Sequence, residues 1–266
     1  MRRLMKGRGL NTVCVEAQCP NQGECFARGT ATFLILGDIC TRGCKFCAVK
    51  RGRPAAPDPS EPRHLAATAR ELDLRHVVIT SVTRDDLPDR GAGQFAACIR
   101  AVHDLLPRTS IEVLIPDLDG RADLLEVVAK AGPQVIAHNL ETVPRLYGQV
   151  RRGADYARSL DVVGQVKQVA PSIVSKSGLM LGLGETDDEI VQVLKDLRGE
   201  ECEVLTLGQY LAPSVQHFPV KRFIPPDAFE RLKEIALGLG FKYVASSPYV
   251  RSSYRAGEAW RAVCGK

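Results

Sequence analysis

The stretch ATFLILGDICTRGCKFC, residues 31–47, decides how the rest of the chain is interpreted. Its first half is an apolar, β-rich run at 32–36, and its second half places Cys40, Cys44 and Cys47 in one short loop directly after that run. In parallel α/β proteins, reactive side chains collect where a buried strand ends in a loop. We therefore predict that this loop holds a bound group.

A second cysteine triplet lies just upstream, in CVEAQCPNQGEC, and consists of Cys14, Cys19 and Cys25. A disulfide framework belongs to small domains that lack a core. This chain has 266 residues, 45% of them hydrophobic, and an odd number of cysteines, nine in all. Metal or cluster ligation is the better interpretation of both triplets.

Zinc and an iron–sulfur cluster are the two alternatives for the ligated group. Structural zinc favours paired C-x2-C units or a pair of nearby histidines, but only Cys44 and Cys47 form such a unit, and the five histidines are scattered singly. Thiolate triplets without a fourth cysteine suit a cubane that leaves one iron for another ligand, so the spacing favours clusters. The remaining Cys98, Cys202 and Cys264 are expected to pack as small apolar side chains or to lie in the tail.

Apolar β-rich runs alternate with amphipathic stretches along the chain. The runs predicted as strands are 32–36, 76–81, 111–116, 134–139, 177–183 and 203–209. The stretches predicted as helices are 60–72, 93–106, 121–132, 155–170, 186–199 and 225–240. This alternation predicts about six βα units and a parallel sheet with right-handed crossovers, either barrel-like or doubly wound.

Polar side chains follow each predicted strand, as expected for the active-site edge of a barrel. Each of these residues has a simpler alternative, because polar loop residues also cap helices and hold turns. The residues are Asp38, Thr83, Asp85, Asp86, Asp117, His138, Asn139, Glu141, Glu185, Gln209 and Tyr210.

The net charge of the chain indicates which class of partner it binds. The formal net charge of +5 is mild and evenly scattered, which favours an acidic protein partner over nucleic acid. No apolar run reaches the roughly 18 residues of a membrane span, and the basic start lacks a secretory signal. We expect a cytoplasmic protein that binds neither nucleic acid nor membranes.

The C-x3-C-x2-C spacing, with Phe46 before the last cysteine, resembles the signature of the radical SAM superfamily. The resemblance implies a partial (βα)6 TIM-type barrel in which Cys40, Cys44 and Cys47 bind three irons of a 4Fe-4S cluster. The fourth iron is left for S-adenosylmethionine, which one electron cleaves to a 5′-deoxyadenosyl radical. Thr83, Asp85, Asn139 and Glu141 lie on the loops after the second and fourth predicted strands, where a carboxylate or amide could bind the ammonium or ribose of the cofactor.

Nearly the whole chain resembles the lipoyl synthases. The motifs are CVEAQCPNQGECF, VVITSVTRDDLPD, HNLETVPRLY, SGLMLGLGE, LTLGQYLAPSVQHFPVKRFIPP and RSSYRAGE. This implies a second, auxiliary 4Fe-4S cluster on Cys14, Cys19 and Cys25, with the catalytic residue Ser253 as its fourth ligand. The sulfides of this cluster would be the sulfur donor. Without the resemblance, RSSY would be interpreted as a turn of hydroxyls. Arg90 departs from the family, which usually has glycine there.

The resemblance also implies a sulfurtransferase reaction and a set of partners. Two sulfurs would be inserted at carbons 6 and 8 of an octanoyl chain on a lysine of a lipoyl carrier domain. Such domains belong to the acyltransferase subunit of 2-oxoacid dehydrogenases and to the glycine cleavage H protein. A flavodoxin or ferredoxin reductant and an iron–sulfur carrier for cluster repair are implied as well.

The resemblance divides the chain into an N-terminal extension (1–30), a barrel (31–247) and a C-terminal tail (248–266). Two alternatives stay open at this point. One is another two-cluster radical SAM enzyme such as a methylthiotransferase, and the other is a non-catalytic two-cluster electron carrier.

Overall fold

A computed structural model describes residues 5, 7–16, 19 and 21–265, and it is built on one eight-stranded sheet. Seven strands are parallel and lie in chain order, with the short strand β1 added antiparallel beside β2. The strands are β1 (Asn11–Thr12), β2 (Thr30–Ile35), β5 (His76–Ser81), β6 (Ser110–Leu114), β7 (Val135–Ala137), β8 (Val174–Leu181), β9 (Val204–Gln209) and β10 (Tyr243–Ser246). Strands β3 (Ile39–Cys40) and β4 (Lys50–Arg51) form a separate parallel pair.

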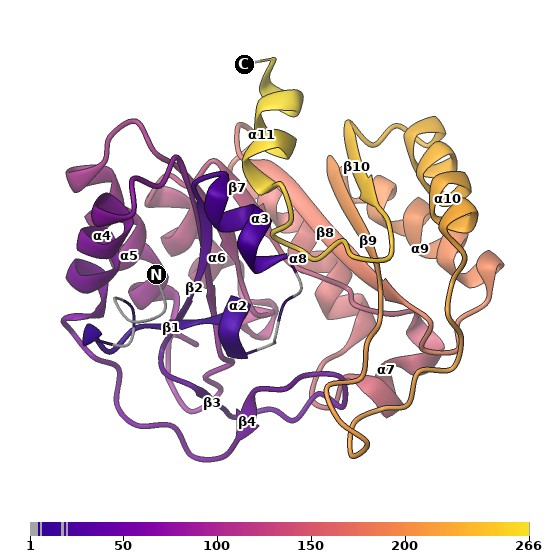
Figure 1. The fold of residues 1–266 in the computed structure, drawn as a ribbon, viewed down its shortest axis with the longest axis horizontal. Helices are drawn as coiled ribbons and strands as arrows, with labels where there is room; N and C mark the ends of the chain where they lie inside the picture. The colour runs from indigo at the N-terminus through magenta and orange to yellow at the C-terminus, as the bar shows by residue number, and fades with distance from the viewer. Residues whose placement is uncertain (1–4, 6, 17–18, 20, 266) are drawn as a thin grey trace.

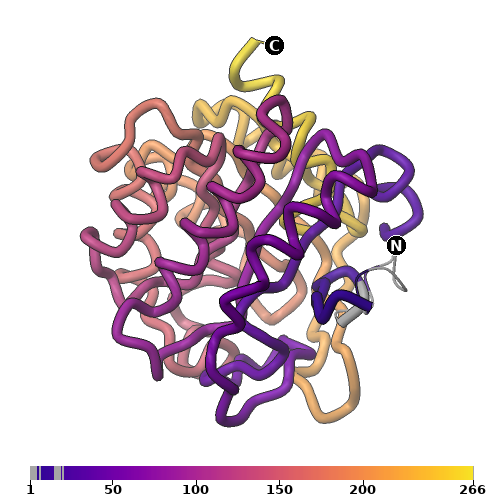
Figure 2. Tube along the Cα trace, turned by 90° about the vertical axis from the view of Figure 1, so that its left-hand side faces the viewer, coloured from indigo at the N-terminus to yellow at the C-terminus, as the bar shows by residue number. Residues whose placement is uncertain are grey.

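The six long helices follow the strands and pack in chain order, each against the next (Figure 1). Figure 2 shows helices lying side by side along one flank of the molecule. They are α4 (Glu61–Glu71), α5 (Ala92–Leu105), α6 (Ala122–Lys130), α8 (Tyr156–Val169), α9 (Asp187–Gly199) and α10 (Pro226–Gly238). The other helices that the structure describes are α2 (Val13–Glu16), α3 (Gln22–Ala27), η1 (Leu118–Gly120), η2 (Pro144–Leu146), α7 (Tyr147–Val150) and α11 (Ala256–Cys264). None of the described helices is both long and apolar enough to cross a membrane.

Alternation along the strands separates the two faces of the sheet. On β2, Phe33 and Ile35 are buried in the core that the helices cover, whereas Thr32 lies on the opposite face, because neighbouring side chains point to opposite faces. At the start of α9, Thr186 and Glu189 form a capping box, which satisfies backbone N–H groups that would otherwise lack partners. Local signals of this kind explain why the predicted helices form.

The predicted α/β architecture is confirmed, with all six predicted strands and all six predicted helices present near their expected positions. The seventh parallel strand, β10, was not predicted. It has only four residues, of which Val244 and Ser246 are buried and the other two are not. A run this short carries little periodic signal, and its pairing with β9 is what makes it a strand.

Helix α11 covers the end of the sheet at which the strands begin. Ala259 packs with Val135, Val174 and Val204, the first residues of β7, β8 and β9. Helix α11 also contacts β5 and β10, which are far apart in the sheet order. The opposite end, at which the strands end and β3 and β4 lie (Figure 1), is therefore the end left open to bind ligands.

Candidate functional site

The chain leaves β2 through a defined turn that directs the cysteines toward the open end of the sheet. Leu36 and Gly37 have φ values of 67° and 93°, in the left-handed region that glycine adopts without strain. Both oxygens of the buried Glu61 accept hydrogen bonds from the backbone N–H of Leu36, at 3.2 and 3.1 Å. Glu61, the first residue of α4, therefore stabilises this turn through its hydrogen bonds to Leu36.

Backbone hydrogen bonds fix the cysteine loop, residues 38–49, against neighbouring loops. The N–H of Thr41 donates to the carbonyl of Thr83 (3.1 Å), and the N–H of Lys45 donates to the carbonyl of Val150 (2.8 Å). Thr83 therefore lies directly beside the loop that carries Cys40.

Arg42, between the first two cysteines of the loop, forms the strongest contacts of this region. Its guanidinium donates two hydrogen bonds to Asp85, both 2.8 Å, and two to Asp117, at 2.7 and 2.9 Å. Asp117 also accepts from Arg158 at 3.0 Å. Bidentate pairs of this kind fix orientation, so this network holds the cysteine loop on the ends of β5 and β6.

The three cysteine thiols of the loop lie within electrostatic range of one another. Burial raises the pKa of Cys44 to about 12; Arg151 lowers that pKa, while Cys47, Cys40 and Glu141 raise it. Burial likewise raises the pKa of Cys47. Buried thiols that hinder one another's ionisation become thiolates when a metal ion binds them, because the positive ion offsets both costs.

Asn139 and Glu141 follow β7 and lie together beside this loop. The Asn139 amide donates to a carboxylate oxygen of Glu141 at 3.1 Å, while its own carbonyl oxygen is buried without a hydrogen-bond partner among the described residues. Burial raises the pKa of the Glu141 carboxyl, whereas Arg151 and Asn139 lower it. The predicted cofactor residues thus form two pairs: Asn139 contacts Glu141, and Thr83 and Asp85 both contact Thr41 of the cysteine loop.

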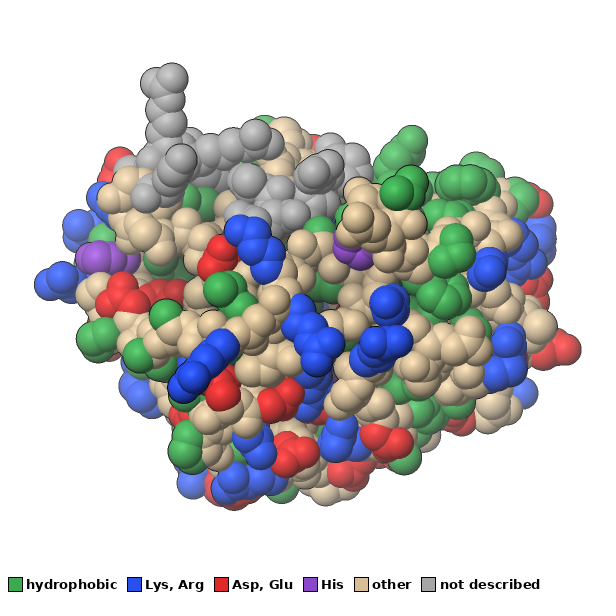
Figure 3. Space-filling view, turned by 90° about the horizontal axis from the view of Figure 1, so that it is seen from below, with side chains coloured by type: hydrophobic (Ala, Val, Ile, Leu, Met, Phe, Trp, Pro, Cys, Tyr) green, Lys and Arg blue, Asp and Glu red, His purple; other side chains and the backbone are tan. Residues whose placement is uncertain are grey.

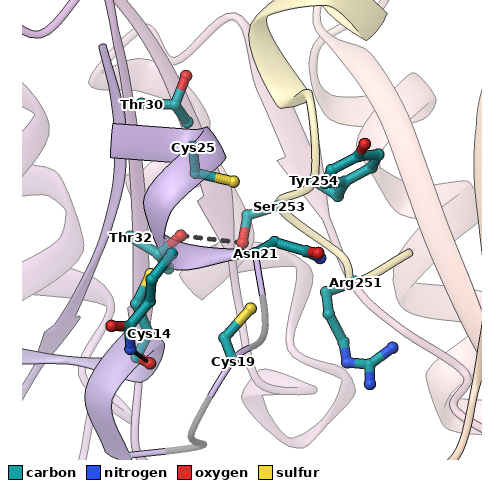
Figure 4. A pocket seen from close by; sticks show the side chains of 10 residues that line it. Cys14, Cys19, Asn21, Cys25, Thr30, Thr32, Arg251, Ser253 and Tyr254 are labelled. Atoms are coloured by element: carbon teal, nitrogen blue, oxygen red, sulfur yellow. Dashed lines mark hydrogen bonds between the residues drawn. The ribbon is translucent and has the colours of Figure 1, made fainter. Parts of the chain in front are cut away.

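The first cysteine triplet forms a separate site, which we call the donor site. Cys14, Cys19 and Cys25 line one pocket together with Ser253 from the far end of the chain. Figure 4 shows the thiols of Cys19 and Cys25 directed toward the Ser253 hydroxyl, which accepts a hydrogen bond of 2.9 Å from Thr32. Three thiols and one hydroxyl from distant segments therefore meet at one place.

The RSSY segment is anchored residue by residue. Ser252 accepts a hydrogen bond from Asn139 (2.6 Å), and Tyr254 donates to Glu24 of α3 at 3.2 Å. Ser253 lies between these two anchors and lines the pocket. Its neighbours hold the segment in place, which leaves the Ser253 hydroxyl available to a ligand.

The charges around the donor site suit a bound cation. Burial raises the pKa of Cys25 to about 11, and Cys19, Cys14 and Glu24 raise it further. Burial also raises the pKa of Cys19, while the backbone N–H of Asn21 and the charge of Arg251 lower it. Ionisation of Cys19 and Cys25 together therefore requires positive charge nearby, as a cluster's irons supply.

Neither triplet is arranged as a single-ion site. Within the described ranges, no group of three or more His, Cys, Asp or Glu side chains could hold one metal ion. A cubane differs, because each thiolate binds a different iron and the thiolates stand further apart. The donor sets therefore fit iron–sulfur clusters better than the zinc considered from the sequence.

Comparisons with known proteins show the family to which the chain belongs. Residues 34–197 match the model of the Radical SAM superfamily. The chain is 58% identical to the lipoyl synthase of Methylococcus capsulatus over 96% of its length, covering 80% of that protein. It is 55% identical to the lipoyl synthase of Caldanaerobacter subterraneus subsp. tengcongensis, covering 96% of this chain and 90% of that one.

Solved structures of low sequence identity share the fold. The peptide-bound structure of SuiB from Streptococcus suis has a TM-score of 0.64 at 12% identity, covering 92% of this chain and 52% of that one. Methylornithine synthase has a TM-score of 0.60 at 14% identity, covering 81% of this chain and 70% of that one. These likenesses concern the fold alone.

The fold, the cysteine loop and the family match define a radical SAM enzyme, which binds S-adenosylmethionine and an iron–sulfur cluster. Within that superfamily, the chain belongs to the lipoyl synthases, which are sulfur-inserting enzymes. The family match covers nearly the whole chain, and it leaves no support for the methylthiotransferase and electron-carrier alternatives.

Sequence reasoning did not single out Arg42, Arg151 or Thr32. Arg42 could have been noticed, because a charged residue inside CTRGC must find a partner where the loop is buried. Thr32 gave no signal, since a threonine in a strand is ordinary. Only the approach of the RSSY segment makes it a contact of Ser253.

Proposed function

We propose that this chain inserts two sulfur atoms at carbons 6 and 8 of an octanoyl chain, which is held in amide linkage to a lysine of a lipoyl carrier protein. Both sulfurs would come from a 4Fe-4S cluster bound at the donor site. The observation that carries the proposal is the separation of six cysteines into two sites, one of which includes the Ser253 hydroxyl.

At the cysteine loop, Cys40, Cys44 and Cys47 would hold a second 4Fe-4S cluster. With S-adenosylmethionine bound, this cluster supplies the 5′-deoxyadenosyl radical that removes hydrogen from an unactivated carbon. Asn139 and Glu141 would orient the cofactor, because a carboxylate and an amide can accept from its ammonium or ribose. Thr83 and Asp85 would act beside them, Asp85 mainly by holding Arg42.

At the donor site, Cys14, Cys19, Cys25 and Ser253 would hold the cluster whose sulfides are the sulfur substrate. Thiolates bind iron more strongly than an alkoxide does, so the corner held by Ser253 opens more easily. The contact from Thr32 keeps the serine oxygen in place. A weakly held corner suits a cluster that is consumed.

The carrier domains of 2-oxoacid dehydrogenase acyltransferases and the glycine cleavage H protein are our proposed substrates. A flavodoxin or ferredoxin would supply electrons, and an iron–sulfur carrier would rebuild the donor cluster. The division into 1–30, 31–247 and 248–266 stays a proposal. The two end segments supply the donor-site ligands, and the middle segment supplies the parallel sheet, its long helices and the cysteine loop. A cytoplasmic location of the protein stays a prediction from the sequence.

Isotope labelling tests the proposal. The protein is reconstituted with heavy sulfide and then incubated without oxygen with dithionite, S-adenosylmethionine, an octanoyl-lysine peptide and unlabelled sulfide. Product carrying two heavy sulfurs, at about one product per chain, is expected. Many turnovers with unlabelled sulfur and no repair protein would contradict the sacrificial role, and absence of any sulfur-bearing product would contradict the function.

A further inference from the structure

The loop from Leu211 to Phe223, here called the rim loop, lies beside the cysteine loop at the open end of the sheet. This loop, orange in Figure 1, follows β9 and lies at the same end of the sheet as β3 and β4. The N–H of Phe218 donates to the carbonyl of Lys45 (2.8 Å), and the His217 ring lies 3.2 Å from the carbonyl oxygen of Cys47. The rim loop therefore borders the site of radical formation.

The rim loop has a defined conformation. Tyr210 donates a hydrogen bond of 2.7 Å to the carbonyl of Phe218, and the N–H of Lys221 donates to the carbonyl of Gly182 at 2.8 Å. Pro213 and Pro219 restrict its backbone further. A surface that is already ordered loses little entropy when a partner binds.

The rim loop exposes large apolar side chains that its own packing does not need. Val215 is fully exposed, Phe223 is 71% exposed and Leu211 is 44% exposed. These three are among only seven exposed large hydrophobic residues in the described part of the chain. Apolar groups gathered on one ordered loop are typical of a surface that a partner covers.

Basic side chains flank these apolar groups on the same face. Figure 3 views this face and shows Lys and Arg side chains across its middle, with hydrophobic side chains on its right-hand half. Arg51, Arg53 and Lys221 are exposed. They form no salt bridge with any residue that the structure describes, although Arg53 lies within electrostatic range of Asp86 and the Lys221 Nζ lies 5.7 Å from the centre of the Phe218 ring. Exposed positive charge beside an apolar patch favours a partner with acidic side chains.

We propose that the rim loop is the docking surface for the folded domain that carries the octanoylated lysine, and that this domain presents acidic side chains to Arg51, Arg53 and Lys221. This inference rests on the proposed function, in which the acyl chain must reach the cysteine loop while its lysine stays attached to a protein. Only the lysine arm can enter the open end, so the domain itself must rest on the rim.

A comparison of two substrates tests the docking surface separately from the chemistry. One substrate is an octanoylated carrier domain, and the other is a short octanoyl-lysine peptide that presents no folded surface. The double substitution Val215→Asp and Phe223→Asp is expected to raise KM for the carrier roughly tenfold or more and to leave KM for the peptide within about twofold. Leu237→Asp, an exposed position on α10, is the matched control and should change neither.

The charged part of the surface is tested by Arg53→Glu and Lys221→Glu. Each should raise KM for the carrier most strongly at low salt, because screening weakens the contact. Lys195→Glu is the control, at an exposed position on α9 that forms no salt bridge within the described part of the chain.

Equal effects on carrier and peptide, or no effect on either, would overturn the docking proposal and leave the sulfur insertion intact. A change of oligomeric state with the double variant in analytical ultracentrifugation would instead assign the patch to a second copy of the chain and also overturn it.

Discussion

Asn139 donates a hydrogen bond of 2.6 Å from its side-chain nitrogen to the Oγ of Ser252, and this contact joins the two sites. Asn139 lies with Glu141 among the predicted cofactor residues, and Ser252 directly precedes the donor-site residue Ser253.

The carbonyl oxygen of Val250 lies so close to Gly208 that a side chain at Gly208 would clash with it. Glycine is therefore required where the C-terminal segment crosses β9.

Ser252→Ala removes the hydrogen bond between the sites and tests their coupling. We expect both clusters to keep their iron and the protein to lose about 1 kcal/mol of stability. Because Ser253 is then held less firmly, more 5′-deoxyadenosine should form for each sulfur inserted. Quantifying both products by mass spectrometry checks this, and Ser252→Thr, which keeps the hydroxyl, should restore the ratio. An unchanged ratio in Ser252→Ala would contradict the coupling.

Ser253→Cys tests whether a weakly bound corner of the donor cluster matters. A thiolate at this position should retain the cluster but slow sulfur insertion roughly tenfold or more, because it binds iron more tightly. Ser253→Ala should keep much of the iron and also impair insertion. Iron and sulfide content, together with single-turnover yield, provide the measurement. Insertion by Ser253→Cys at the wild-type rate would show that the oxygen ligand is dispensable.

Arg42→Ala tests the network that holds the cysteine loop. Asp117 is 1% exposed but keeps Arg158 as a partner, so the loss of the Arg42 hydrogen bonds should cost about 1–3 kcal/mol. The loop cluster should be lost while the donor cluster survives, so that bound iron falls by about half. Electron paramagnetic resonance and iron analysis check this. Arg145→Ala, which breaks an exposed pair with Glu189, should cost under about 1 kcal/mol.

His138 predicts how stability depends on pH. Burial lowers its pKa to about 3, and Arg151 contributes to that lowering. Because the folded-state pKa lies below the ordinary value of 6.5, the unfolded chain binds the proton first on acidification. Stability from neutral His138 is therefore present above pH 6.5 and is lost as the pH falls toward 3, by at most about 1.4 kcal/mol per pH unit.

Urea unfolding of wild type and His138→Gln at pH 7 and pH 5 measures this contribution. The substituted protein should lose less stability between the two pH values than the wild type does. Identical losses would show that His138 is not held neutral in the folded chain.

Most secondary structure was predictable because it depends on local signals. Ser60 and Pro62 predict the start of α4, and its observed first residue is Glu61. The Ser60 hydroxyl, however, donates to Asp58 rather than capping the helix. The short helices α3 and α7 were not predicted, because segments of four to six residues carry too few turns for a periodic signal. Helix α11 is as long as the predicted α6 and was missed because its residues were interpreted as a tail.

Sequence spacing by itself determined that Cys40, Cys44 and Cys47 share one loop, because three cysteines within eight residues cannot lie far apart. It also determined the order of the βα units and hence the end of the sheet at which loops carry function. Arg90, where the resemblance implies glycine, adopts a φ of 53°, in the left-handed region that glycine adopts without strain.

The meeting of Ser253 with Cys14, Cys19 and Cys25 was expected from the family resemblance but from no local pattern of residues. Only the tertiary structure decided that Asn139 contacts Ser252 and that Arg42 joins Asp85 to Asp117. Each of these contacts links segments that are far apart in the chain. They depend on the order of strands in the sheet and on the path of the last segment across it, and no local pattern of residues encodes either one.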